Sequence, residues 1–122
     1  MTDVITDIVS LVPGNGLDGR HSEPNIYPYA IVTQRDCRLA TTLGDRPLWH
    51  VTVDVMAVSN NPAGTRLYTR RVIDALDGQR IDGYRLTHVT SGPVLADRGD
   101  PTDWCWTCTT EFTITTLRRP RD

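Results

Sequence analysis

The sequence has no lysine, so all 13 of its basic residues are arginine. The 15 acidic residues slightly outnumber them, and the formal net charge is -2. A charge this small gives no long-range field that attracts nucleic acid or an anionic membrane, so we expect no sequence-specific nucleic-acid partner. An arginine-only set suits surfaces that bind carboxylates, because the guanidinium fork pairs with them bidentately. A GC-rich genome explains the same usage, so no function follows from it.

Long apolar runs are also missing. A membrane-spanning helix needs roughly 20 consecutive apolar residues, and no run in the sequence approaches that length. Asp3 and Asp7 stand where a secretory signal would carry positive charge. We therefore expect a protein that is made in the cytoplasm and has no membrane partner.

Cysteine is scarce, and Cys37, Cys105 and Cys108 are an odd number of thiols. Without an export signal, this predicts reduced thiols rather than a disulfide framework. Cys105 and Cys108 have the spacing of a metal or redox pair, but no second pair of ligands accompanies them. On a strand, residues three apart point to opposite faces, so both thiols could not reach one ion. We expect neither a metal nor a cofactor.

Recognisable catalytic motifs are absent as well. His21, His50 and His88 are scattered, and no nucleophile elbow, phosphate loop or paired-carboxylate spacing accompanies them. His50 and Asp54 fall on one face of a predicted strand, four residues apart, which is too far for a direct hydrogen bond. We therefore expect solvated sheet residues and no enzyme, with a catalytic His50–Asp54 pair as the alternative.

The clearest pattern that is present is a strand followed by a helix. Residues 65–78 have apolar residues at helical spacing, with Thr65 as the expected N-cap and Gly78 at the end. Before them, residues 48–58 alternate as a strand with one dry face. The residues of that face are Trp49, Val51, Val53, Val55 and Ala57.

The remaining segments supply neighbours for this pair. Helical spacing begins after Thr2 or Asp3 and ends before Pro13, and alternation predicts strands at 26–33, 84–90 and 104–116. The polar stretch 15–25 is expected to be a loop, 34–47 a long hairpin connection or flap, and 91–103 a loop or bulged edge. We therefore expect residues 1–122 to form a single domain with an α+β fold, in which two helices pack on a largely antiparallel four-stranded sheet.

The order and spacing of these elements resemble a known family. The resemblance rests on a strand pattern at 27–32 after a short helix, the strand at 51–55, the helix end at 72–78 and the closing alternation at 111–114. Together they are similar to tail terminator proteins, also called tail completion or tail-to-head joining proteins, of bacteriophages with long non-contractile tails. Members of that family form a six-fold ring that caps the finished tail tube and stops its polymerisation.

The resemblance implies a structural virion protein. Its expected partners are further copies of itself in a homo-hexameric ring, the tail tube protein, and the head-completion or connector protein. Its expected place is the head-proximal end of the tail, after assembly in the host cytoplasm. Two other classes stay open. One is a different head-tail connector or minor tail subunit, and the other is a small enzyme or ligand-binding domain with a pocket at His50, Asp54 or His88.

Candidate contact residues lie in the polar loops and at one strand mouth. Mixed charge in these loops suits a ring in which an arginine of one subunit meets a carboxylate of the next. Trp104 is the aromatic residue expected at an interface, whereas Trp49 and Trp106 fit the core. The helix face with Arg66 and Arg70 is the second choice for a contact surface. The candidate interface residues are Arg38, Arg46, Arg98, Asp100 and Trp104.

Overall fold

The computed structural model describes residues 4–18, 27–44, 46–81, 83–97 and 105–117. These residues contain two helices, α1 (Val4–Leu11) and α2 (Pro62–Leu76). The strands among them are β1 (Asn15–Asp18), β2 (Tyr29–Leu43), β3 (Arg46–Ser59), β4 (Arg80–Ile81), β5 (Tyr84–Arg85), β6 (Thr87–Ser91), β7 (Leu95–Asp97) and β8 (Cys105–Thr116). No helix in this part of the chain is long and apolar enough to cross a membrane.

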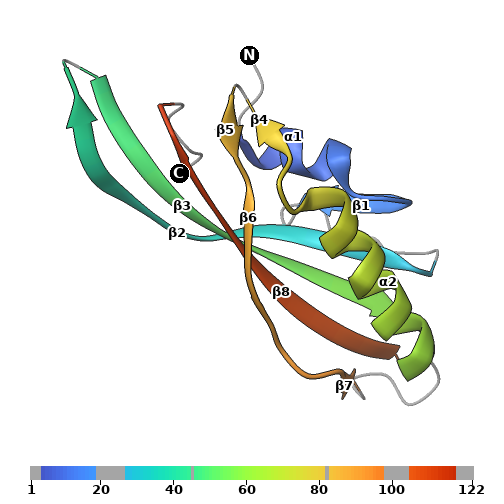
Figure 1. Ribbon diagram of the computed structural model, residues 1–122. Coiled ribbons are helices and arrows are strands. Elements are labelled where there is room, and N and C mark those ends of the chain that lie inside the picture. The colour runs from blue at the N-terminus through green and yellow to red at the C-terminus, as the bar shows by residue number, and fades with distance from the viewer. Residues whose placement is uncertain (1–3, 19–26, 45, 82, 98–104, 118–122) are drawn as a thin grey trace.

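Six of the strands form one mixed sheet (Figure 1). Its order is β1-β2-β3-β8-β6, and β7 also pairs with β8. β1 runs parallel to β2, while the other neighbours are antiparallel. β4 and β5 form a separate two-stranded sheet. The expected α+β fold with two helices on a four-stranded sheet is therefore wrong, because most of the described residues lie in strands, which form a six-stranded mixed sheet and a two-stranded sheet.

The fold prediction failed in the polar stretches. β1 and β7 have four and three residues, too few to show the alternation by which a strand is recognised. The stretch 34–47, expected to be a long hairpin connection or flap, does connect the two strands, but it is itself mostly strand, because β2 continues to Leu43 and β3 begins at Arg46. Gly44 lies in the turn between them with a φ of 64°, a conformation that glycine adopts without steric cost.

The core lies between the helices and one face of the sheet. Ile8 of α1, Leu76 of α2 and Phe112 of β8 are fully buried in the same apolar cluster. Burying a side chain of this size contributes roughly 1.5–3 kcal/mol. The expected dry face of β3 is confirmed for four of its residues and half-buried at Trp49. The four buried residues are Val51, Val53, Val55 and Ala57.

α2 begins three residues before the expected N-cap. Asn61 caps the helix, because its side-chain oxygen accepts a hydrogen bond of 2.6 Å from the backbone N–H of Gly64. Thr65 is buried inside the helix instead, and its hydroxyl donates to the carbonyl oxygen of Trp106 in β8 at 3.0 Å. The threonine therefore ties the first turn of α2 to the sheet.

The first helix and β1 are fixed by close contacts. A Cβ atom at Gly16 of β1 would lie 2.7 Å from the carbonyl oxygen of Val9, so only glycine fits this approach to α1. The hydroxyl of Tyr68 in α2 donates to the carbonyl oxygen of Pro13 at 2.7 Å. Burial raises the pKa of the Tyr68 phenol, which keeps that donor protonated.

Candidate assembly interface

The hairpin of β2 and β3 extends past the other strands of the sheet (Figure 1). β1 pairs with β2 only up to Val32, and β8 pairs with β3 only from Trp49 onward. Residues 40–44 and 46–48 thus form a two-stranded ribbon with no third strand beside it in the described part of the chain. Arg38 and Leu39 lie at its base, opposite His50 and Trp49, where β8 already flanks β3. We call the ribbon together with these two base residues the hairpin arm. Figure 1 shows that it projects from the sheet on the side away from α2.

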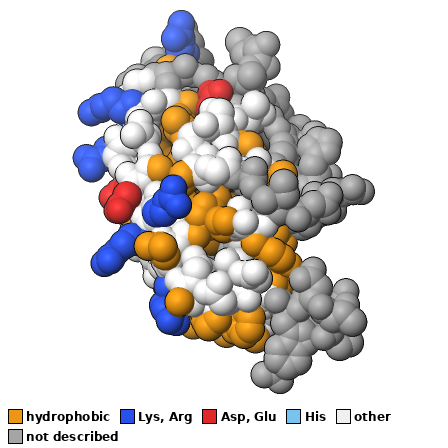
Figure 2. Space-filling view, turned by 90° about the vertical axis from the view of Figure 1, so that its right-hand side faces the viewer, with side chains coloured by type: hydrophobic (Ala, Val, Ile, Leu, Met, Phe, Trp, Pro, Cys, Tyr) orange, Lys and Arg blue, Asp and Glu red, His pale blue; other side chains and the backbone are white. Residues whose placement is uncertain are grey.

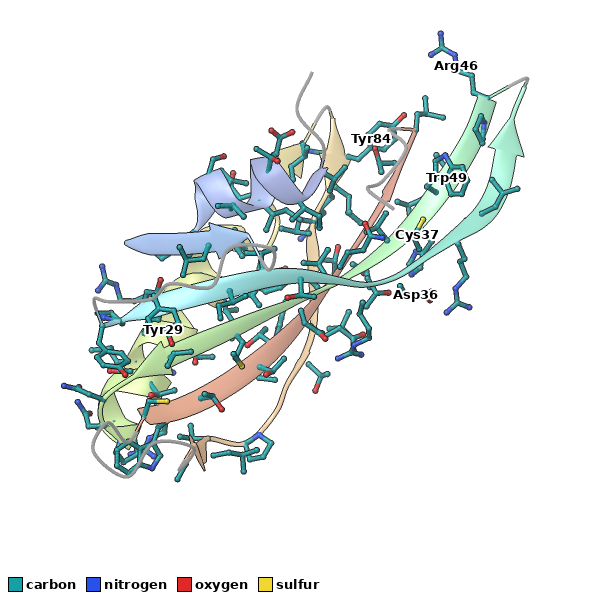
Figure 3. The ribbon with its side chains drawn as sticks, turned by 180° about the vertical axis from the view of Figure 1, so that it is seen from behind. Tyr29, Asp36, Cys37, Arg46, Trp49 and Tyr84 are labelled. Atoms are coloured by element: carbon teal, nitrogen blue, oxygen red, sulfur yellow. The ribbon has the colours of Figure 1, made fainter. Side chains whose placement is uncertain are left out.

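The two faces of the arm differ in chemistry. Leu39 lies opposite Trp49 in the pairing register, on the face that the helices cover further along the sheet. Arg38 lies opposite His50, on the other face. Figure 3 shows Trp49 partway along this hairpin and Arg46 near its tip. At the base of the arm, one face thus carries Leu39 and Trp49, and the other carries Arg38 and His50.

Arg38, a predicted interface residue, pairs within its own strand. Its Nη2 and Nε atoms lie 2.8 Å and 3.2 Å from Oδ2 of Asp36. This hydrogen bond lowers the pKa of the Asp36 carboxyl. The side chain of Arg38 is 70% exposed, and exposed pairs of this kind add little stability. The guanidinium is therefore accessible to another molecule while it holds Asp36.

Arg46, the second predicted interface residue, opens β3 at the tip of the arm. It is exposed and lies opposite Leu43. Figure 3 shows its side chain pointing away from the sheet. Within the described ranges, no ion pair includes it. Its position suits contact with another molecule. The other three predicted residues, Arg98, Asp100 and Trp104, lie outside the described residues.

An ion cluster that the sequence did not reveal lies near the base of the arm. Asp54 of β3 and Glu111 of β8 stand directly opposite each other. Arg35 sits where the β2 register shifts, and it reaches both carboxylates. Its Nε atom donates to Asp54 Oδ2 at 2.8 Å, and its Nη1 atom donates to Glu111 Oε1 at 2.5 Å. One guanidinium thus joins three strands.

The electrostatics of this cluster favour a charged arginine. The hydrogen bond to Asp54, with the attraction of both carboxylates, raises the pKa of Arg35. Its Nη2 atom lies 2.7 Å from Asp54 Oδ1, close enough for attraction although this oxygen has no aligned hydrogen bond. Two like charges directly opposite across strands would repel. Arg35 removes that repulsion and fixes β2 against β3 and β8.

The alternative catalytic pair is not assembled. The Nδ1 atom of His50 lies 3.2 Å from the hydroxyl of Thr115, while Asp54 is held by Arg35. The cysteine pair is divided as expected, because Cys108 is buried with its thiol 3.3 Å from the Gly92 carbonyl oxygen and Cys105 is half-buried. Among the described residues, no three His, Cys, Asp or Glu side chains are grouped to hold a metal.

The second-choice surface lies along α2. Arg66, Arg70 and Arg71 are exposed on this helix, and Leu67 between them is 62% exposed. Figure 2 shows the side of the molecule that includes α2, where basic side chains gather along one margin and hydrophobic side chains form a band beside them. A basic surface with an apolar neighbour is suited to an acidic protein partner.

Comparison with known proteins does not assign the chain to a family. No protein-family model matches the sequence, and no curated protein matches it at a significant level.

Proposed function

We propose that this chain is a ring-forming structural subunit of a bacteriophage tail, of the tail terminator type. In this role, six copies cap the tail tube, end its polymerisation and join the tail to the connector protein of the head. The proposal places the protein in the virion, at the head-proximal end of the tail. The tail tube protein, the connector protein and further copies of the chain are its partners.

The hairpin arm is the observation that supports this role best. Ordering each backbone residue costs roughly 1–2 kcal/mol of conformational entropy, and Leu39, which is 53% exposed, recovers little of that by burial. A two-stranded ribbon alone in water is only marginally stable. An arm of this kind gains stability when another molecule packs against it, which favours a protein that works inside an assembly.

The chemistry of the arm agrees with a subunit contact. Specific interfaces have an apolar centre and a polar rim. Leu39 and Trp49 supply apolar surface on one face of the hairpin, and Arg38 and Arg46 carry exposed guanidinium groups on the other face. The resemblance of the sequence patterns at 27–32, 51–55, 72–78 and 111–114 to the tail terminator family also supports the proposal.

Deletion of the gene tests the proposal directly. Electron microscopy of particles that lack the protein is expected to show abnormally long tails and unjoined heads, because nothing ends tube growth. Tails of normal length on intact particles would contradict the proposal. If the deletion particles have heads joined to tails of normal length but lack some other part of the particle, the protein is instead another connector or a minor tail subunit.

Charge reversal in the same deletion strain locates the contact surface. Arg46→Glu is expected to reduce phage yield while leaving the melting temperature nearly unchanged, because its side chain points into solvent. Arg66→Glu, an exposed arginine on α2, is the matched control. If Arg66→Glu reduces the yield and Arg46→Glu does not, the contact surface lies on α2.

A further inference from the structure

The main sheet has two edges that carry backbone hydrogen-bonding groups. On one side, residues 38–43 of β2 have β3 as their only neighbouring strand among the described residues. On the other side, β6 and β7 pair with β8 and end the sheet. Edge strands of this kind are templates for pairing with another chain. We call them the arm edge and the β6–β7 edge.

Large exposed hydrophobic side chains gather at these two edges. The described residues include four such side chains, and only Leu67 lies on a helix. Leu39 lies on the arm edge and is 53% exposed, while Val89 and Leu95 lie on the β6–β7 edge and are 50% and 58% exposed. Both edges carry some protection against pairing, since β7 has three residues and Arg38 on the arm edge is charged. The apolar side chains on both edges would nevertheless gain contacts from the side chains of a further strand.

The strand directions make the two edges complementary. β2 is antiparallel to β3, β3 to β8, and β8 to β6, so β2 and β6 run in opposite directions. A second copy set beside the first in a similar orientation therefore brings its β6–β7 edge antiparallel to the arm edge. Such a contact joins different surfaces of the two copies, and it closes into a ring when the rotation between copies divides a full turn.

We propose that the arm edge of each copy pairs with the β6–β7 edge of the next copy, so that the sheet continues from subunit to subunit around a ring. This inference rests on the proposed function, because it names the contact through which the ring closes. A two-fold contact between two arm edges would also form a ladder. It would leave Val89 and Leu95 exposed. Pairing of the arm edge with the β6–β7 edge covers these two residues as well as Leu39, so it accounts for more of the exposed apolar surface.

Single lysine substitutions on each edge test the contact. Lysine on an edge strand disfavours pairing, and the sites are more than half exposed, so the fold is preserved. Leu39→Lys and Leu95→Lys are each expected to weaken self-association by at least about tenfold, measured by sedimentation velocity over a concentration series. Leu67→Lys, on the helix, is the matched control and is expected to associate like the unchanged protein.

Mixing the two edge variants gives the sharper result. The L39K protein keeps an intact β6–β7 edge, and the L95K protein keeps an intact arm edge. An equimolar mixture is therefore expected to form a one-to-one dimer and nothing larger, because each pair has one working contact and cannot extend. Native mass spectrometry of the mixture identifies this heterodimer.

Other outcomes overturn the inference. If the L95K protein associates normally while the L39K protein does not, the contact is two-fold between arm edges. If both variants associate normally, or if the unchanged protein stays monomeric up to its solubility limit, these edges do not pair. The measurement uses no phage, so it separates the two proposals. Normal tails in the deletion strain refute the function even where the edges pair in solution.

Discussion

The long hairpin β2–β3 has two halves with different surroundings. In the half near the helices, β3 is flanked by β2 and β8, and its residue Val53 is fully buried. Beyond the base of the arm, the strands have only each other in the described part of the chain, and Leu39 at that base is 53% exposed. The same pair of strands thus builds the core at one end and an exposed ribbon at the other. Stability resides in the first half, and the contact surface that we propose resides in the second.

The largest expected effect tests this division in the core. Phe112 is fully buried between the sheet and the helices, and Phe112→Ala is expected to lower the free energy of unfolding by about 3–5 kcal/mol. Leu39→Ala, in the arm, is expected to cost within about 0.5 kcal/mol, as exposed substitutions do. Urea unfolding followed by circular dichroism measures both.

A milder core change covers the case in which Phe112→Ala does not fold. Phe112→Leu keeps an apolar side chain at the buried site, and it is expected to cost less than Phe112→Ala and more than Leu39→Ala. Equal losses for the core and arm substitutions would show that the arm packs against the body in solution, and the division between the two halves would then be wrong.

Segments that pack on the core could be predicted from the sequence. Apolar residues alternate along β3 and β8 and recur at helical spacing along α2, because each element buries one face in the core. Val53, Phe112 and Leu76 are the buried examples from these three elements. The arm carries no such signal, since a ribbon outside the core has no dry face to impose a period of two. Its polar residues therefore predict a hairpin connection or flap and not the paired strands that the structure has there. The short strands β1 and β7 owe their structure to the neighbouring strand and not to their own pattern.

The candidate site could be predicted only in part. Arg38 and Arg46 are exposed on the hairpin that connects the two strands, while their role as contact residues stays a prediction. The cluster of Arg35, Asp54 and Glu111 could not be found, because it depends on the register of three strands. The register of β2 also shifts beside Arg35, so counting residues from the turn does not reveal the pairing.

The second prediction concerns the ion cluster between the two halves. Arg35→Ala is expected to lower stability by less than Phe112→Ala, because it leaves the carboxylates of Asp54 and Glu111 facing each other without a cation. Adding Glu111→Gln to this variant removes one of the two charges and is expected to restore part of the loss. Thermal unfolding of the single and double variants measures both effects.

The double variant also provides the control for this prediction. Glu111→Gln alone removes one of the two partners of Arg35 and keeps the contact with Asp54. If the double variant is no more stable than Arg35→Ala, like-charge repulsion is not the cause of the loss. The Arg35 side chain would then stabilise the sheet through its packing across the three strands and not through its charge.

The smallest expected effect concerns the pair of Arg38 and Asp36 at the base of the arm. The hydrogen bond from Arg38 lowers the pKa of Asp36 in the folded state. The pair therefore stabilises the fold at pH values above the pKa that Asp36 has in the unfolded chain. This contribution is lost as the pH falls through the lower folded pKa. Arg38→Ala is expected to raise the Asp36 pKa toward its ordinary value, with a minor change in stability because both side chains are largely exposed. An NMR titration of the Asp36 side chain measures the shift.

Arg46→Ala is the control. Arg46 pairs with Leu43 at the tip of the hairpin, far along the strand pairing from Asp36, which pairs with Thr52. An unchanged Asp36 pKa in Arg38→Ala would mean that the pair does not persist in solution and that Arg38 is available to a neighbouring subunit without first giving up a partner.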